Sequence, residues 1–360
     1  MKFWKMKNNL LFLKSIFLSK LKSTPYKLNF AITSACNSRC LTCNVGRIFQ
    51  KNPEVIKNDL KTEEIGKLFD SLPPTITWLS FSGGEPFLRQ DLVDIISLAI
   101  LKIPSLSVIS IPSNGLSTQR IIATVKTILN LDNLPQFFLN FSIDGPPEIH
   151  DKIRGVQGGY KKTWSTYEAI KELSQKNNKL RVNLEITISQ LNLNSLIEFC
   201  EELVKNNEKV TITIAHHGFL YKNENLNSIL VNKDQIHKIR RIISIINKSL
   251  SWLSPPELVE KLYLGKIVDY LINPQNQVLP CQALSTSFAI SPQGEMAPCF
   301  MWGEKLGNVK KTKVMKIWRS SHTQRIRQLI KLNNCPNCWT PCEAYQSIIW
   351  TFLTGRWNRL

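Results

Sequence analysis

Short runs of β-branched and aromatic residues alternate with longer amphipathic segments over most of residues 27–214. Such short runs favour strands, whereas apolar residues that recur every three or four positions favour helices. Strands that alternate with helices form parallel units with right-handed crossovers. The pattern predicts an α/β fold, a partial (β/α)6 TIM-like barrel followed by a small cysteine-rich C-terminal domain. The expected strands are 27–32, 76–81, 107–111, 137–143, 182–188 and 210–214, and the expected helices are 61–72, 91–102, 118–131, 162–176 and 193–205.

Polar signatures follow four of the expected strands. In parallel β/α folds, chemistry gathers at the carboxyl ends of the strands, because those ends meet at one face. We therefore expect one functional site at this face. The signatures are residues 36–43, 82–86, 113–115 and 144–146.

The first signature holds three cysteines, Cys36, Cys40 and Cys43, with spacers of three and two residues. A loop of that size can turn three thiolates toward one centre. Structural zinc sites and electron-carrying clusters normally have four protein ligands, whereas three ligands leave a position for a small molecule. A zinc site completed by a distant Cys or His is the alternative.

Residues 36–43, which read Cys-Asn-Ser-Arg-Cys-Leu-Thr-Cys, resemble the signature of the radical S-adenosylmethionine superfamily. Thr42 is a mild departure, because an aromatic or another variable residue usually precedes the third cysteine. The resemblance continues in order through Ser-Gly-Gly-Glu-Pro at 82–86, Ser-Asn-Gly at 113–115 and Ser-Ile-Asp-Gly at 142–145. It covers about residues 27–215.

The resemblance implies that Cys36, Cys40 and Cys43 hold three irons of a [4Fe–4S] cluster whose fourth iron binds S-adenosylmethionine. Electron transfer to this cofactor would release a 5′-deoxyadenosyl radical, which removes hydrogen from an unactivated C–H bond. Gly83 and Gly84 would admit the cofactor closely, because they lack a Cβ. The other expected cofactor contacts are Glu85 for the ammonium, Ser113 and Asn114 for the ribose, and Ser142 and Arg154 for the carboxylate. The alternatives are an ordinary tight turn at the glycines and a solvent-exposed charge at Arg154; no residue is identified as catalytic.

A second group contains Cys281, Cys299, Cys335, Cys338 and Cys342. Residues 290–299 predict a β-hairpin with a Pro-Gln-Gly turn. The group resembles the SPASM and Twitch auxiliary domains, and five cysteines suit one auxiliary [4Fe–4S] cluster that relays electrons better than the two clusters of a full SPASM domain. Which of the last three cysteines is not a ligand stays open, and a zinc ribbon is the alternative.

Residues 1–24 carry six lysines and no acidic residue. This composition suits a helix at an anionic membrane surface, although Lys7 and Lys14 fall within the apolar arc of Phe3, Leu10, Phe17 and Leu21. The expected divisions are a basic apolar segment at 1–25, a core at 26–217, a helical bridge at 218–279, an auxiliary domain at 280–345 and a tail at 346–360.

The formal net charge of +19 favours an acidic partner but does not identify it. No export signal or membrane span is evident, so we expect a cytoplasmic protein, with peripheral membrane contact as one option. The resemblance implies an enzyme that modifies a peptide, sugar or lipid and receives electrons from a donor such as flavodoxin or ferredoxin. An RNA- or nucleoside-modifying radical enzyme and a non-catalytic zinc- or cluster-binding protein are the alternatives.

Overall fold

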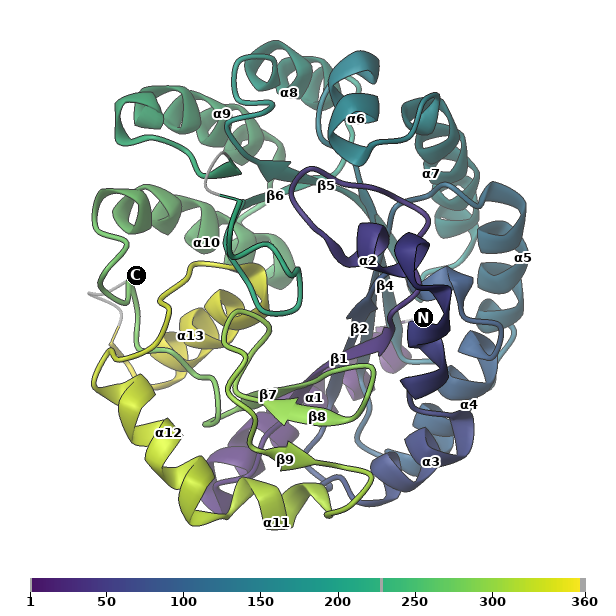
Figure 1. Ribbon diagram of the computed structural model, residues 1–360, viewed down its shortest axis with the longest axis vertical. Coiled ribbons are helices and arrows are strands. Elements are labelled where there is room, and N and C mark those ends of the chain that lie inside the picture. The colour runs from purple at the N-terminus through teal and green to yellow at the C-terminus, as the bar shows by residue number, and fades with distance from the viewer. Residues whose placement is uncertain (1, 227–228, 357–360) are drawn as a thin grey trace.

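The computed structural model describes residues 2–226 and 229–356, and side chains from residue 10 onward, so the last four residues of the expected tail lie outside it. Its sheet has the order β6-β5-β4-β3-β2-β1-β7-β8-β9 (Figure 1). The six predicted strands are confirmed, and they pair in parallel along the chain. They are β1 (Lys27–Thr33), β2 (Trp78–Gly83), β3 (Val108–Ser113), β4 (Gln136–Ser142), β5 (Leu180–Ile188) and β6 (Val210–Ile214).

The cysteine-rich region begins by extending this sheet. Strand β7 (Ser287–Ile290) pairs in parallel with β1, and β8 (Glu295–Ala297) returns antiparallel to β7. The predicted hairpin is therefore confirmed, with a positive φ of 85° at Gly294 in its turn and Cys299 just beyond β8. Strand β9 (Gly307–Asn308) completes the edge. Residues 280–345 thus share a sheet with the core, although the sequence predicts a separate small domain.

Helices form a ring outside the sheet (Figure 1). The five helices expected between strands are confirmed, whereas α6 after the fourth strand is not among those predicted. Helix α13 crosses the expected boundary at residue 345, and α10 packs against both β6 and α13, between the two ends of the sheet. The helices are α1 (Lys2–Lys22), α2 (Val45–Lys51), α3 (Thr62–Asp70), α4 (Leu92–Lys102), α5 (Thr118–Leu129), α6 (Pro147–Arg154), α7 (Gly159–Lys176), α8 (Leu196–Lys205), α9 (Ile236–Ser249), α10 (Pro255–Ile272), α11 (Val314–Trp318), α12 (Ser321–Lys331) and α13 (Pro341–Leu353), with 3-10 turns η1 (Pro53–Asn58), η2 (Pro86–Leu88) and η4 (Lys233–Gln235).

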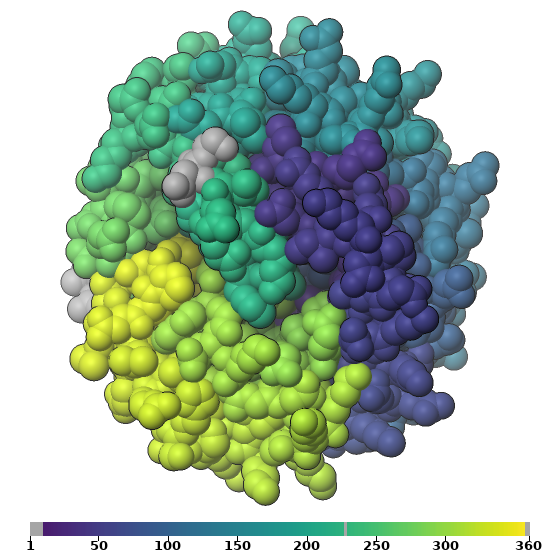
Figure 2. Space-filling model, viewed as in Figure 1, coloured from purple at the N-terminus to yellow at the C-terminus, as the bar shows by residue number. Residues whose placement is uncertain are grey.

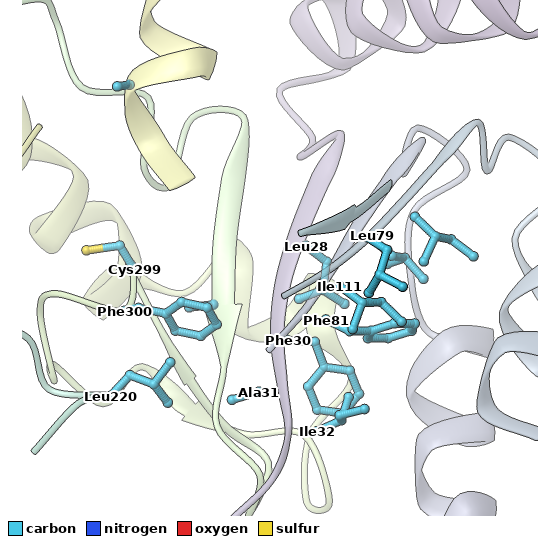
Figure 3. Packing of buried hydrophobic residues seen from close by; sticks show 14 of the residues in the cluster. Leu28, Phe30, Ala31, Ile32, Leu79, Phe81, Ile111, Leu220, Cys299 and Phe300 are labelled. Atoms are coloured by element: carbon cyan, nitrogen blue, oxygen red, sulfur yellow. The ribbon is translucent and has the colours of Figure 1, made fainter. Parts of the chain in front are cut away.

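Alternate strand residues divide between the helical layer and the barrel interior, because successive side chains of a strand point to opposite faces. Leu28, Phe30 and Ile32 are fully buried in the apolar cluster. Figure 3 shows Leu28 and Phe30 beside neighbours from β2 and β3. The other face of the sheet carries polar residues such as Asn29, Asn140 and Asn183. The apolar layer fixes the sheet, and the interior is left for polar chemistry.

Candidate functional site

The loop after β1 holds the first three cysteines at the carboxyl face of the barrel. Arg39 N donates to Arg154 O at 2.9 Å, and Leu41 N donates to Ile153 O at 2.7 Å, so one side of the loop rests on the end of α6. On the other side, Asn44 N donates to Tyr221 O at 2.9 Å. Segments before β5 and after β6 therefore fix a loop that follows β1.

All three thiols of this loop are free; Cys40 is buried, and Cys36 and Cys43 are partly buried. Burial raises the pKa of Cys36 and of Cys40, and it raises the pKa of Cys43 to about 12. Without metal these thiols are protonated at neutral pH. Because thiolate is the form that binds metal, cluster binding at this loop must displace protons.

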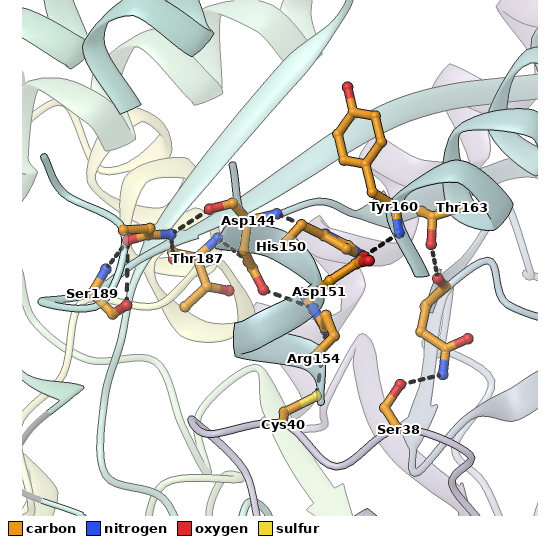
Figure 4. A network of polar contacts seen from close by, with 12 residues as sticks. Ser38, Cys40, Asp144, His150, Asp151, Arg154, Tyr160, Thr163, Thr187 and Ser189 are labelled. Atoms are coloured by element: carbon orange, nitrogen blue, oxygen red, sulfur yellow. Dashed lines mark hydrogen bonds and ion pairs between the residues drawn. The ribbon is translucent and has the colours of Figure 1, made fainter. Parts of the chain in front are cut away.

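Arg154 lies beside the cysteine loop. Its Nε is 2.7 Å from Asp144 Oδ2, and one of its terminal nitrogens is 3.9 Å from Cys40 Sγ (Figure 4). Burial acts to lower the pKa of Arg154, but interactions with the neighbouring Asp144 and Cys40 side chains outweigh it and raise the pKa. The side chain is only 15% exposed, so the alternative of a solvent-exposed charge is wrong.

Glu85 joins the ends of β2 and β3. Its carboxylate accepts hydrogen bonds from Asn114 N at 2.7 Å, Ser113 Oγ at 3.0 Å and Phe87 N at 3.2 Å. Burial raises the pKa of Glu85 to about 7, although these hydrogen bonds act to lower it. A carboxylate has about four acceptor sites, and these hydrogen bonds occupy three of them. The internal role of Glu85 was not predicted from the sequence.

The two glycines before Glu85 allow the backbone of another segment, residues 33–35, to approach closely. A Cβ on Gly83 would come within 2.4 Å of Thr33 O, and one on Gly84 within 2.0 Å of Ala35 O. Gly83 also has a φ of 124°, which L side chains rarely adopt. The close approach brings the end of β2 against the start of the cysteine loop, where Glu85 N donates to Ala35 O at 2.7 Å.

Asn114 connects the end of β3 to the same loop. Its Nδ2 donates to Asn37 Oδ1 at 2.7 Å and to Ser38 Oγ at 3.1 Å. Ser142 ends β4 and pairs with Glu185 of β5 in the sheet register. All seven expected cofactor-binding residues thus lie at the carboxyl face, together with the three cysteines.

Two interior residues were missed by the sequence analysis. Glu185 projects from the polar face of β5, and burial raises its pKa while the charge of Arg154 opposes this shift. Burial also raises the pKa of Tyr221, and the charges of Cys342, Glu185 and Cys43 add to the effect. The segment after β6 joins the two cysteine groups, because Tyr221 O accepts from Asn44 N beside Cys43, and Leu220 N donates to Phe300 O beside Cys299 at 3.0 Å. This segment covers the middle of the face (teal-green in Figure 2). Neither residue belongs to a local motif, so no sequence signal marks them.

Four cysteines of the second group line one cavity. They are Cys281, Cys299, Cys335 and Cys338, and the fifth, Cys342, is not part of the lining. Burial raises the pKa of each of Cys281, Cys299 and Cys338. Within the described parts of the chain, no three His, Cys, Asp or Glu side chains surround a position for a single metal ion.

A buried polar network links the start of α13 to β1 and β7. Lys27 Nζ donates to Cys342 O at 2.8 Å and lies 4.1 Å from the centre of the Trp78 ring. Glu343 accepts from Asn29 Nδ2 at 3.0 Å and from Ser287 Oγ at 2.5 Å. The network fixes the second cysteine group against the barrel.

Both cysteine groups lie within regions of the chain that match known protein families. Residues 30–203 match the Radical SAM superfamily, and residues 281–342 match the SPASM iron-sulfur cluster-binding domain. The AdoMet-dependent heme synthase of Oleidesulfovibrio alaskensis is 23% identical over 316 residues, 81% of this chain and 73% of that protein. The PqqA peptide cyclase of Rhizobium meliloti is 22% identical over 320 residues, 83% of this chain and 74% of that protein.

A solved structure shares the fold. The structure of anSMEcpe with bound AdoMet and the Cp18Cys peptide has a TM-score of 0.63 at 14% identity, and the match covers 93% of this chain and 98% of that one. The likeness confirms the α/β fold and the partial barrel.

Proposed function

Because the chain belongs to the radical S-adenosylmethionine superfamily and carries a SPASM iron–sulfur domain, we propose that it removes hydrogen from a C–H bond of a peptide, sugar or lipid. The observation that carries this proposal is the placement of two cysteine groups around one polar barrel interior. Tyr221 belongs to the segment that joins the two groups, and Glu185 projects from the polar face of β5, where a substrate would contact both.

In this proposal Cys36, Cys40 and Cys43 hold the first cluster. When bound, the cluster and S-adenosylmethionine supply an oxidant strong enough to take hydrogen from an unactivated carbon. Arg154, beside Cys40, can donate to the cofactor carboxylate with the guanidinium nitrogens that Asp144 does not use. Ser142 is the second carboxylate contact. These residues orient the cofactor at the carboxyl face and exclude water from it.

The ribose and the ammonium group of the cofactor need contacts of their own. Asn114 and Ser113 are the proposed ribose contacts, although Ser113 Oγ already donates to Glu85. The free acceptor direction of Glu85 would take the ammonium group, and a charge-assisted hydrogen bond there would be shorter and stronger than a neutral one.

The cavity of Cys281, Cys299, Cys335 and Cys338 supports one auxiliary [4Fe–4S] cluster with four protein ligands. A cluster with no open iron would relay electrons rather than bind substrate. This arrangement implies a net oxidation, or electron return after radical coupling. A small electron-transfer protein such as flavodoxin or ferredoxin would supply electrons to the first cluster.

The barrel interior favours a peptide or a sugar over a polycarboxylate substrate. Haem and related porphyrins carry carboxylates, which need cationic partners when buried. Of the interior cations, Lys27 donates to Cys342 O, and in this proposal Arg154 is taken by Asp144 and the cofactor carboxylate. Asn140 and Asn183, whose amides are hydrogen-bonded to each other at 3.1 Å, and the carboxylate of Glu185 make the interior polar, which suits a hydrogen-bonding substrate such as a peptide or a sugar. An RNA- or nucleoside-modifying enzyme remains the alternative that the net charge favours.

Anaerobic reconstitution with iron and sulfide tests the proposal. We expect about eight irons per chain, little zinc, and formation of 5′-deoxyadenosine when dithionite and S-adenosylmethionine are added. Zinc in place of iron, or full iron loading without 5′-deoxyadenosine, would instead support the non-catalytic binding protein.

A further inference from the structure

Helix α1 presents four large apolar side chains to solvent. Leu10, Leu13, Phe17 and Leu21 are 68%, 55%, 60% and 65% exposed. Their spacing of three, four and four residues places them on one face of the helix, and we name this set the α1 apolar stripe. Exposed apolar side chains that occur singly are ordinary, whereas a continuous stripe indicates an interaction surface.

The opposite face of α1 is anchored on the barrel. Ser15, Ile16 and Ser19 are at most 4% exposed, and Ser19 Oγ donates to Thr24 O. The Phe12 ring packs against Tyr26 and Trp78, with centroids 6.4 Å from each. Because this face is docked, the α1 apolar stripe points away from the barrel. Leu10, Phe17 and Leu21 of the predicted apolar arc are exposed, whereas the docked apolar face with Phe12 and Ile16 was not predicted.

The stripe lies at the end of the barrel opposite the cofactor. Tyr26 and Trp78 precede or begin the first two strands, so α1 covers the amino ends of the strands. In Figure 1, α1 is pale because it lies on the far side, behind the sheet. Further exposed apolar residues lie at this end. Trp252 and Leu253, 67% and 95% exposed, precede Glu257, which pairs with Lys209 at the start of β6.

Basic side chains border the stripe. On an ideal helix with about 100° per residue, Lys14 and Lys20 fall on opposite sides of it, and both are exposed. The prediction that Lys14 falls within the apolar arc is therefore wrong, because Lys14 borders it. Lys20 Nζ also lies 5.1 Å from the centre of the Trp350 ring, so the end of α13, with the exposed Leu353, adjoins the stripe. The sequence of α1 contains no acidic residue.

We propose that α1 docks the amino end of the barrel on an anionic lipid bilayer. Apolar side chains flanked by lysines match the boundary between acyl chains and acidic headgroups. A second copy of the same face would oppose lysines to lysines on a chain of net charge +19, so charge complementarity favours the lipid. None of the helices in the described residues is long and apolar enough to cross a bilayer, so the contact is peripheral. The proposal is independent of the proposed reaction, and it turns the cofactor face away from the membrane.

Vesicle sedimentation of the reconstituted full chain tests the proposal. The chain should bind vesicles of phosphatidylcholine with phosphatidylglycerol, bind less as NaCl rises, and bind poorly to phosphatidylcholine alone. The double variant Leu13→Gln/Phe17→Gln should bind at least about tenfold more weakly, because two large apolar side chains lose their contact with the acyl region. The matched control Ile272→Gln/Leu332→Gln, 51% and 69% exposed in the wild type outside the α1 surface, should bind as the wild type does.

Cofactor cleavage and light scattering complete the test. Both double variants should form 5′-deoxyadenosine at the wild-type rate, so a loss of vesicle binding cannot result from misfolding or from failure of the reaction proposal. Equal binding by the wild type and Leu13→Gln/Phe17→Gln, or no binding to acidic vesicles, would overturn the proposal. A dimer that this variant dissociates in the absence of vesicles would also overturn it, because the stripe would then join two copies.

Discussion

Gly84 illustrates how one missing Cβ positions the first cysteine loop. A Cβ there would overlap the Ala35 carbonyl and lie 3.1 Å from Cys36 Cβ. We expect Gly84→Ala to lower the free energy of unfolding by about 1–3 kcal/mol, the usual effect of overpacking, and to reduce iron in the first cluster. Chemical denaturation and iron analysis measure both effects.

Gly265 is the matched control, because an added Cβ there would meet nothing within 4 Å. It lies within α10, so Gly265→Ala should raise stability by about 0.5–1 kcal/mol through helix propensity. If Gly84→Ala were equally harmless, the contact between the end of β2 and the cysteine loop would not exist in solution.

The three cysteines of the first loop are expected to act as one set. Cys36→Ala, Cys40→Ala and Cys43→Ala should each abolish 5′-deoxyadenosine formation and leave about half of the iron, because the auxiliary cluster has separate ligands. Iron analysis and chromatography of the reaction products test this. Normal product formation by any of the three variants would contradict the assignment of these ligands.

Cys342 is expected to be the spare cysteine of the second group. Its thiol does not line the cavity that the other four share. Cys342→Ser should therefore keep full iron and the low-temperature electron paramagnetic resonance signal of the auxiliary cluster, whereas Cys338→Ser should lose both. The opposite result would identify Cys342 as a ligand and exclude Cys338.

At the scale of elements, α10 and α13 meet through buried polar groups. Tyr345 Oη donates to Glu260, and the Tyr263 ring stacks on Trp339 at 5.8 Å. Burial raises the pKa of Glu260 to about 7 from its ordinary value of 4.5. The second carboxylate oxygen of Glu260 is also buried. An ionised Glu260 therefore destabilises this contact.

The raised pKa determines the sign of a pH dependence. The folded state binds the proton of Glu260 more tightly than the unfolded state, so its contribution to stability is complete below about pH 4.5 and is lost as pH rises to about 7. Glu260→Gln does not titrate. Its free energy of unfolding, measured relative to the wild type, should therefore rise by about 1–3 kcal/mol between pH 5 and pH 8.

Anaerobic thermal unfolding followed by circular dichroism measures this difference. Glu85 and Glu343, whose pKa values burial also raises, titrate in both proteins and cancel. Glu257→Gln is the control, because this carboxylate is at the first turn of the same helix and is 25% exposed. A pH-independent difference for Glu260→Gln would show that the carboxyl group is solvated.

At the scale of the whole molecule, the cysteine-rich region completes the barrel. Strand β7 covers the edge of β1, and Glu343 joins both strands through Asn29 and Ser287. A chain truncated after residue 279 would leave β1 with an unpaired edge and Lys27 without its partner Cys342 O. We expect it to aggregate, because exposed edge strands pair with other chains. A soluble monomer with native circular dichroism would show instead that residues 280–345 form an independent domain.

The sequence by itself determined the elements and the outline of the site. The six strands could be predicted within a few residues because their β-branched and aromatic residues form short runs that alternate with longer helical segments. The cysteine spacing, the two glycines and the hairpin turn could be recognised because the residues of each feature lie close together in the chain. A strand end also fixes the face on which its signature lies, which brought six of the seven expected cofactor contacts to one end of the barrel. The seventh, Arg154, is the last residue of α6.

Only the tertiary structure decided how distant residues pair. The partners of Glu85, the burial of Arg154 against Asp144 and Cys40, and the joining of the two cysteine groups by the segment of Tyr221 depend on contacts between separate elements. The cavity that excludes Cys342 and the parallel pairing of β7 with β1 bring together residues that lie far apart in the chain. The sequence gives the apolar residues of α1, but which of them face the barrel depends on where the helix docks. The periodicity of a segment indicates which of its residues share a face. It does not indicate which other element packs against that face.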